Sequence, residues 1–252
     1  MDFTGRVVVV TGGTRGVGRG IAHAFLAAGA DVVVCARHAP DELPASSGRA
    51  ATFVAADVRR ADEAHAVVAA ATERHGRLDV LVNNAGGSPE VPAADASANF
   101  VTSVVALNLL APFFCAQAAN AVMQGQDEGG SIVNIASVSA LRPSPGTAAY
   151  GAAKAGLVNL TRTLAVEWAP AVRVNCVVAG LVATEASFDH YGGSEGIAVV
   201  AGTVPMGRMG TPEDVARVCL FLCSPLAAYV SGAAVEAHGG GERPAYRGAL
   251  EG

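Results

Sequence analysis

The sequence has few charges, few aromatic residues and no long apolar run. Charged residues make up 15% and aromatic residues 5% of its 252 residues, and the formal net charge is −5. This acidic balance argues against a nucleic-acid partner or an anionic membrane surface, both of which require basic clusters. No stretch reaches about 18 uninterrupted apolar residues, so the sequence predicts no membrane-spanning helix. The first residues, MDFTGR, lack the basic and apolar regions of a signal peptide.

Cysteine pairs with a metal-binding or redox spacing are also missing. The five cysteines form no C-x-x-C motif and no zinc-ligand pattern, so the sequence predicts no metal site. Cys219 and Cys223 stand four apart in an apolar stretch and are expected to be small buried hydrophobes. A reducing cytoplasm is the simplest location for such a protein.

What the sequence does contain is a regular alternation of strand-like and helix-like segments. Strands are predicted at 7–10, 31–36, 52–55, 78–83, 131–136, 172–178 and 233–236, and helices from 21 and near 61–75, 97–124, 147–168 and 212–223. This order predicts an α/β fold: a single doubly wound parallel sheet of about seven strands with helices on both faces, forming one domain over 1–252. Ligands of such sheets bind beyond the carboxyl ends of the strands.

Three segments depart from the alternation. Pro40 and Pro44 predict that any helix in 37–49 is short or missing. The segment 185–210 is long for a connection, which is typical of a lid or binding loop, and we expect it to form a substrate loop. Its apolar side chains, such as Phe188 and Ile197, could line a pocket or pack into the body of the protein. A tail, 242–252, follows the last strand.

The glycine cluster TGGTRGVG at 11–18 follows a buried strand and precedes a helix. Such a turn directs backbone N–H groups and a helix N-terminus at an anion, and a nucleotide phosphate is the expected guest. It is not a P-loop, because Arg19 and Gly20 replace the lysine and hydroxyl residues, and Ile21 breaks the pattern G-x-G-x-x-G. On this stretch alone an ordinary tight turn remains the alternative.

An ordered set of motifs resembles the short-chain dehydrogenase/reductase family over nearly the whole chain. The set consists of TGGTRGVG (11–18), NNAG (83–86), Asn108, Ser137, YGAAK (150–154), AGLVAT (179–184), PMGRMGTPEDVA (205–216) and VSGAAVEAHGG (230–240). Each motif alone is modestly specific, whereas the ordered set is highly specific. The resemblance implies a Rossmann fold, a nicotinamide cofactor and catalysis by Asn108, Ser137, Tyr150 and Lys154.

The pair Tyr150 and Lys154 suits proton transfer. Residues four apart on a helix share a face, and a nearby ammonium favours the phenolate, so we expect Lys154 to lower the pKa of Tyr150. The resemblance implies that Lys154 also holds the nicotinamide ribose, that Ser137 binds the substrate oxygen and that the Asn108 carbonyl anchors a proton-relay water. Ser139 is the closest rival of Ser137, but its spacing to Tyr150 is two residues short.

The resemblance also assigns the cofactor-binding residues. They are Gly12, Thr14, Arg15, Gly16, Val17, Gly18, Arg37, Asp57, Val58, Asn84, Ala85, Gly86, Tyr150, Lys154, Gly180, Val182 and Thr184. Asp57 could instead be a helix N-cap. The residue that ends the second strand is Ala36 rather than the carboxylate that binds the ribose of NAD. The missing carboxylate at Ala36, together with Arg37 and Arg15, predicts that the cofactor is NADP, with NADPH preferred over NADH.

The predicted activity is hydride transfer between NADP and a ketone or secondary alcohol, a small-molecule partner. A 3-oxoacyl thioester reductase-like enzyme is the first expectation. A steroid or other cyclic-alcohol dehydrogenase and a non-catalytic NADP(H)-binding regulator are the alternatives. Family resemblance implies a homo-oligomer, a tetramer or dimer, built on helices 97–124 and 147–168 and the last strand. Ala179 replaces the usual proline after strand six, which predicts a looser turn there.

Overall fold

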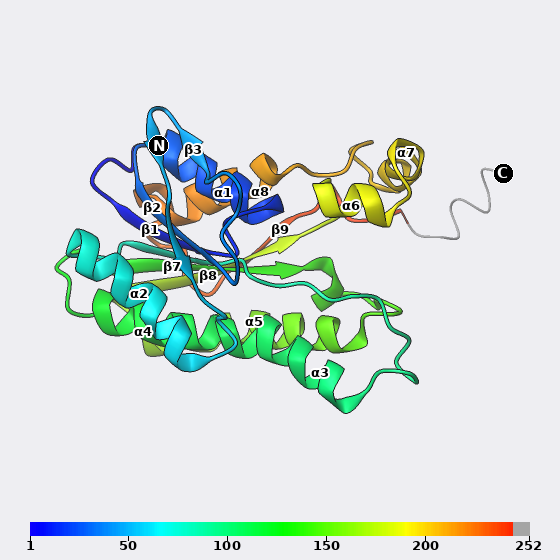
Figure 1. Cartoon of the computed structure of the whole chain (residues 1–252), viewed down its shortest axis with the longest axis horizontal. Coiled ribbons are helices and arrows are strands. Elements are labelled where there is room, and N and C mark those ends of the chain that lie inside the picture. The colour runs from blue at the N-terminus through cyan, green and yellow to red at the C-terminus, as the bar shows by residue number, and fades with distance from the viewer. Residues whose placement is uncertain (244–252) are drawn as a thin grey trace.

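The computed structural model describes residues 1–243, and within them seven parallel strands form one sheet (Figure 1). The order across the sheet is β5-β2-β1-β6-β7-β8-β9. The strands are β1 (Val7–Thr11), β2 (Asp31–Ala36), β5 (Thr52–Ala55), β6 (Val80–Asn83), β7 (Gly130–Ser137), β8 (Val172–Ala179) and β9 (Ala234–Ala237). The chain builds outward from β1 in one direction and from β6 in the other. The crevice of this doubly wound fold therefore opens where β1 and β6 meet.

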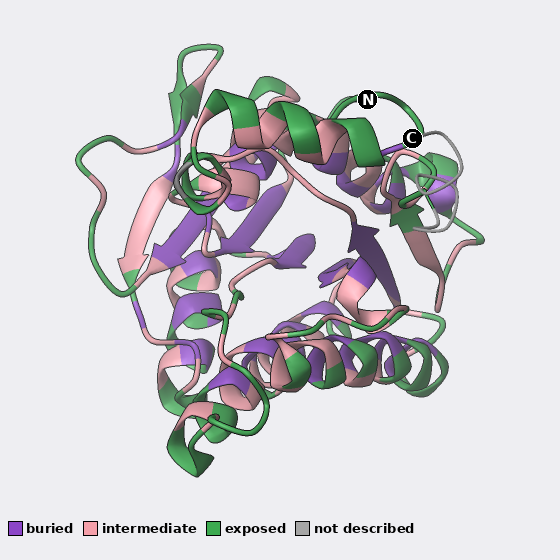
Figure 2. Ribbon diagram, turned by 90° about the vertical axis from the view of Figure 1, so that its right-hand side faces the viewer, coloured by how far each residue is buried: buried purple, intermediate pink, exposed green. Residues whose placement is uncertain are grey.

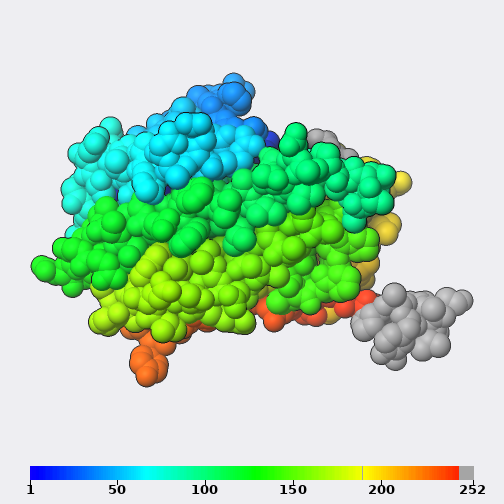
Figure 3. Space-filling model, turned by 90° about the horizontal axis from the view of Figure 1, so that it is seen from below, coloured from blue at the N-terminus to red at the C-terminus, as the bar shows by residue number. Residues whose placement is uncertain are grey.

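Helices cover both faces of the sheet. On one face lie α1 (Gly16–Ala27) and α8 (Pro212–Cys223), and on the other α2 (Ala61–His75), α4 (Ala111–Met123) and α5 (Ala148–Glu167). A further helix, α3 (Ala98–Val105), runs through a π-helical turn, η1 (Ala106–Leu110), into α4. Figure 3 shows α2, the α3–α4 unit and α5 as successive bands across the lower face of the molecule.

The core explains why the central strand β1 is apolar over Val7–Val10. Val7 and Val9 face the layer of α2 and α4, whereas Val8 and Val10 face α1 and α8. All four are buried, because a parallel sheet between two helix layers has no solvent face. Viewed along the strands, Figure 2 shows the buried sheet at the centre and the exposed surfaces on the outer sides of the helices.

The structure confirms the predicted Rossmann-like sheet and moves several boundaries. Each predicted strand forms, with ends shifted by at most two residues, and α2 and α8 have the predicted limits. Helix α1 begins at Gly16, well before the first periodic apolar residue, Ile21, because the glycines of the turn already belong to its first turn. The segment 37–49 forms no helix, as its prolines suggested. It contains part of a short hairpin, β3 (Ala45–Ser46) and β4 (Arg49–Ala50).

The connection 185–210 is not an irregular loop but contains two helices. They are α6 (Glu185–His190) and α7 (Ser194–Thr203), joined by two glycines with positive φ, Gly192 and Gly193. The expectation of a loop rested on the length of the segment. Its Gly, Ala and Val content is also compatible with short helices. Of the predicted tail, residues 244–252 lie outside the described residues.

The continuous helical segment Ala98–Met123 is long and apolar enough to cross a membrane by length and composition alone. Polar residues such as Asn108 interrupt this segment, so it contains no long uninterrupted apolar run. In the fold α4 packs against α2 and against β6 and β7. Only 28% of its most apolar window is buried within the described chain, which leaves part of its apolar surface uncovered.

Candidate active site

The glycine turn between β1 and α1 closes tightly on the segment that follows β6. A Cβ at Gly12 would lie 3.0 Å from the Ala85 Cα, and one at Gly18 would lie 2.4 Å from the Asn84 Nδ2. The Asn84 Nδ2 donates to the carbonyl oxygens of Thr11 (3.0 Å) and Gly12 (3.2 Å). Side chains at these glycines would therefore fill the cradle and push the two segments apart. The NNAG motif acts first as a brace for the glycine turn.

Thr11 belongs to this arrangement although the sequence did not single it out as a binding residue. Its Oγ1 accepts hydrogen bonds from the backbone N–H groups of Asn84 and Ala85, both at 3.0 Å. The signal available in the sequence was its place as the last residue of a buried strand, directly before the glycines. A hydroxyl at that position can satisfy backbone groups that a valine would leave unpaired.

The N-terminus of α1 faces the space above this turn. Arg15 precedes the helix in an extended conformation and makes no side-chain cap, so no protein side chain caps the first N–H groups from that position. Gly16 has a φ of +50°, and a Cβ there would lie 3.5 Å from the Thr184 Cγ2. Thr184 of the AGLVAT motif thus stands next to the turn. These residues fit a pyrophosphate, because a glycine cradle and a free helix N-terminus both favour a bulky anion.

Asn108 and Lys154 meet at Gly86. Asn108 is completely buried in η1, where its Oδ1 accepts from the Gly87 N–H and its Nδ2 donates to the Gly87 and Val104 carbonyls, all at 2.9 Å. A Cβ at Gly86 would lie 2.7 Å from the Asn108 Oδ1 and 3.1 Å from the Lys154 Nζ. The π-helical turn, a feature frequent at functional sites, thus brings the amide of Asn108 against the end of the NNAG motif.

Lys154 is a buried cation. Lys154 is 3% exposed, and its Nζ donates to the Ile135 carbonyl at 2.8 Å. Burial lowers the pKa of this amine to about 8, because a charged group loses hydration in the interior. A lysine is rarely buried without a functional reason, since its charge costs free energy at neutral pH.

Tyr150 and Ser137 complete the cluster. The Lys154 Nζ lies 5.7 Å from the centre of the Tyr150 ring. The expected lowering of the Tyr150 pKa is not what the structure shows: burial raises this pKa, and a hydrogen bond with Ser137 offsets part of that effect. The reason is that the lysine stands beside the ring and hydrogen-bonds Ile135, whereas the phenol itself is largely desolvated. A protonated phenol is the form that can donate a proton to a carbonyl.

Ser137 rather than Ser139 faces the phenol. Ser137 is the last residue of β7, opposite Ala179 of β8, and its Oγ accepts from the Ser139 N–H at 3.2 Å. The hydroxyl of Ser139 turns to the Ser144 Oγ instead, at 3.1 Å. The spacing argument that preferred Ser137 therefore agrees with the geometry.

At the other end of the crevice, Asp57 follows β5. It is not a helix N-cap, because α2 begins at Ala61 with Arg60 in the N-cap position. Its carboxylate is bound by Arg59, a residue that the sequence analysis did not name. Val58 is buried in the core beside α2. Arg15 and Arg37 are both exposed, and within residues 1–243 neither forms an ion pair with a carboxylate.

The segment after β8 is held by backbone hydrogen bonds. The N–H of Gly180 donates to Ala237, that of Ala183 to Gly210, and Val182 pairs with Gly210 in a parallel bridge. The expectation of a loose turn at Ala179 is therefore not supported, because Ala179 still belongs to β8 and pairs on both sides. A Cβ at Gly180 would lie 2.7 Å from the His238 Cα, which explains glycine there.

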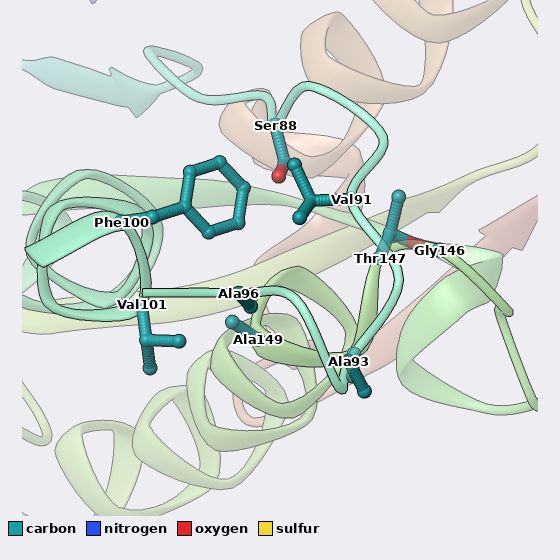
Figure 4. A pocket seen from close by; sticks show the side chains of 10 residues that line it. Ser88, Val91, Ala93, Ala96, Phe100, Val101, Gly146, Thr147 and Ala149 are labelled. Carbon is teal, nitrogen blue, oxygen red and sulfur yellow. The ribbon is translucent and has the colours of Figure 1, made fainter. Parts of the chain in front are cut away.

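The structure contains one cavity beside Thr184 and another beside the start of α5. An open one of about 470 Å³ is lined by Thr184, Phe188, Ile197 and Pro212, so two of the apolar residues of 185–204 do line a pocket. The other, of about 210 Å³, lies between the segment 88–96, α3 and the start of α5 (Figure 4). There the Phe100 ring lies beside Ser88 and Val91, and the lining residue Ala149 directly precedes Tyr150.

Comparisons with known proteins agree with this geometry. Residues 12–242 match the family model described as enoyl-(acyl carrier protein) reductase. The 3-oxoacyl-[acyl-carrier-protein] reductase FabG of Chlamydia pneumoniae is 35% identical over 95% of this chain and 99% of its own length. The L-rhamnose 1-dehydrogenase (NAD(P)(+)) of Azotobacter vinelandii is 35% identical, with coverages of 93% and 96%. The chain belongs to the short-chain dehydrogenase/reductase family.

The fold comparison leads to the same family. The aldohexose dehydrogenase of Thermoplasma acidophilum superposes with a TM-score of 0.87 at 28% identity, covering 94% of each chain. Members of the short-chain dehydrogenase/reductase family are oxidoreductases of alcohols and ketones that use NAD or NADP, so the chain is an enzyme of that class. The predicted residues near Gly12, Arg37, Asp57, Asn84, Ser137 and Thr184 each lie at or after the carboxyl end of a strand of the sheet.

Proposed function

We propose that the chain is an NADP-dependent oxidoreductase that interconverts a ketone and a secondary alcohol. The observation that carries the proposal is the cluster of the half-buried Ser137 and Tyr150 with the buried Lys154, placed beside the glycine cradle. A structural lysine would not need to be buried with its nitrogen between the Ile135 carbonyl and the Tyr150 ring. The bound nicotinamide would supply or accept the hydride, which no side chain can do.

The chain's own residues would manage the proton. Tyr150, kept protonated by its burial, would donate to the oxygen of a carbonyl substrate. Ser137 would hydrogen-bond the same oxygen and stabilise the charge that develops on it. Lys154 would place a cation beside the phenolate left behind. Asn108 would hold the segment at Gly86 and Gly87 in place through its two side-chain hydrogen bonds with the Gly87 backbone.

The preference for NADP over NAD is supported by the charges at the end of β2. Ala36 brings no carboxylate to the expected ribose site, and Arg37 follows it on the surface. Arg15, also exposed, precedes α1 on the neighbouring strand-to-helix turn. Within residues 1–243 neither guanidinium group is paired with a carboxylate, and two such groups at one edge suit the 2′-phosphate, which they can bind through charge-assisted hydrogen bonds.

The best candidate substrate is a 3-oxoacyl thioester. The similarity to the 3-oxoacyl reductase and the apolar cavity lined by Phe188 and Ile197 both support an acyl chain. A cyclic alcohol is the second candidate, because the relatives named L-rhamnose 1-dehydrogenase and aldohexose dehydrogenase act on cyclic sugars. We also propose that the protein is cytoplasmic.

The deciding experiment measures NADPH oxidation with 3-oxoacyl thioesters and cyclic ketones, and NADP⁺ reduction with sugars and cyclic alcohols. Tyr150→Phe should lower kcat by at least about 100-fold, the usual loss for a general acid, with the Kd for NADPH within about threefold of wild type. Tyr229→Phe is the matched control, because Tyr229 is fully exposed and lies far along the chain from the cluster. Tight NADPH binding without turnover on the whole panel would instead identify a non-catalytic regulator.

We further propose a homo-oligomer that covers the exposed apolar side chains of the long helices. Of the apolar residues of these helices, Leu157 and Leu164 are buried within the protein and leave no surface for a partner. Val101, Leu110 and Val166 of the same helices are exposed. Light scattering should give a dimer or tetramer, and substitution of Leu110 and Val166 by Glu should shift it towards the monomer.

A further inference from the structure

Asp57 and Arg59 form an ion pair at the adenosine end of the crevice. The Arg59 Nε donates to both carboxylate oxygens of Asp57, at 2.9 and 3.0 Å, and the Arg59 Nη2 contacts the second oxygen as well. The Arg59 Nη1 donates to the Ser103 Oγ of α3 at 3.1 Å, which fixes the guanidinium from its other side. The carboxylate of Asp57 is therefore already held by one cation within its own loop.

A second arginine lies at the same edge of the sheet. Ala36 of β2 pairs with Ala55 of β5, and the Ala56 N–H donates to the Ala36 carbonyl at 3.0 Å. Arg37 and Asp57 thus leave two adjacent strands at the same level. The hydrogen bond from Arg59 is the main reason that the pKa of Asp57 is low, and the charge of Arg37 contributes in the same direction. Asp57 is consequently within electrostatic range of both guanidinium groups.

This juxtaposition creates a conflict if Arg37 binds a phosphate. An uncompensated carboxylate at Asp57 would attract Arg37 towards itself and would repel the negative charges of a 2′-phosphate. Both effects would weaken NADP and leave NAD almost unaffected, because NAD carries a neutral hydroxyl at that position. A cation paired with Asp57 would reduce both effects.

We propose that Arg59 is a specificity-determining positioning residue, which neutralises Asp57 and so leaves Arg37 available for the 2′-phosphate of NADP. The proposal rests on the NADP preference proposed above and adds a residue to it. Arg59 would contact neither the phosphate nor the ribose, because it acts through Asp57. A purely structural role, joining the start of α2 to Ser103, would change the binding of both cofactors equally.

The test measures the Kd values for NADP⁺ and NAD⁺ by isothermal titration calorimetry at low ionic strength, and reports the ratio Kd(NAD⁺)/Kd(NADP⁺). Arg59→Gln should lower this ratio about tenfold, and the loss should shrink as salt screens the charges. Arg60→Gln is the matched control. Arg60 is the next residue and has the same charge, but it pairs with Asp62 at 3.0 Å and Glu63 at 2.7 Å instead of Asp57.

A double variant tests whether Arg59 acts through Asp57. In D57N/R59Q the carboxylate is gone, so the ratio should return to within about twofold of that of D57N alone. This comparison also serves if Arg59→Gln by itself is too unstable to purify. Equal weakening of both cofactors in Arg59→Gln, an equal loss of the ratio in Arg60→Gln, or a persistent loss in the double variant would each overturn the proposal. A wild-type ratio below one would instead overturn the proposed NADP preference.

Discussion

Replacing Lys154 by methionine should stabilise the fold while abolishing turnover. Burial lowers the pKa of Lys154 from 10.5 to about 8, so keeping its charge at pH 7 costs roughly 3 kcal/mol, at 1.36 kcal/mol for each pKa unit. Methionine has a similar unbranched shape and needs no hydration. It leaves the Ile135 carbonyl without its donor at 2.8 Å, which costs about 1–2 kcal/mol. The unfolding free energy should therefore rise by about 1–2 kcal/mol at pH 7.

The pH dependence of this gain follows from the direction of the shift. Between about pH 8 and pH 10.5 the unfolded wild type binds a proton at Lys154 that the folded protein has released, so the stability of the wild type rises with pH over this range. The gain of the variant should be largest below pH 8 and should disappear as the ionisation cost fades; by about pH 10.5 only the missing donor to Ile135 is left, and the variant should be about 1 kcal/mol less stable than the wild type.

The assay is urea denaturation of both proteins without added nucleotide, from pH 7 to pH 10.5, followed by circular dichroism. Lys154 is the only lysine in the sequence, and the other titrating groups are present in both proteins, so their contributions cancel in the difference. A variant that is less stable than the wild type at pH 7, or a difference that does not change with pH, would refute the assignment of Lys154 as a cation held at the expense of stability. Such a cost is common where function requires a buried charge.

Two further perturbations test the cradle and a helix end. Gly18→Ala should lower the unfolding free energy by about 1–2 kcal/mol and weaken NADPH binding, because its Cβ would lie 2.3 Å from the Gly12 carbonyl oxygen. Thermal melting measures the loss. The control is Gly202→Ala, where nothing lies within 4 Å of the new Cβ and a small gain in stability is expected. Arg208 holds the pKa of Asp214 down to about 2. Asp214→Asn should therefore lower the unfolding free energy by about 1–2 kcal/mol near neutral pH, and this loss should fade as the pH drops from about 4 to about 2. A cost that stays constant in urea titrations over that range would contradict the pairing.

The sequence by itself determined the order of elements and the identity of the family. The run VVVC inside β2 is apolar because the strand is buried on both faces there, and this pattern can be read from the sequence without any knowledge of neighbours. The ordered motifs also predicted candidate catalytic and cradle residues, because the chemistry requires those residue types at those points of the chain. The segment 185–210 was harder, because its small apolar residues suit a loop and a short helix equally.

Only the tertiary structure decided how charges behave. Whether Tyr150 is made more or less acidic depends on how deeply it is buried and on which atom Lys154 meets, and neither follows from a spacing of four. The pairing of Asp57 with Arg59, and the approach of Arg37 from another strand, likewise arise from the register between β2 and β5. Desolvation and long-range contacts are properties of the folded arrangement, so they become visible only when the sheet has been assembled.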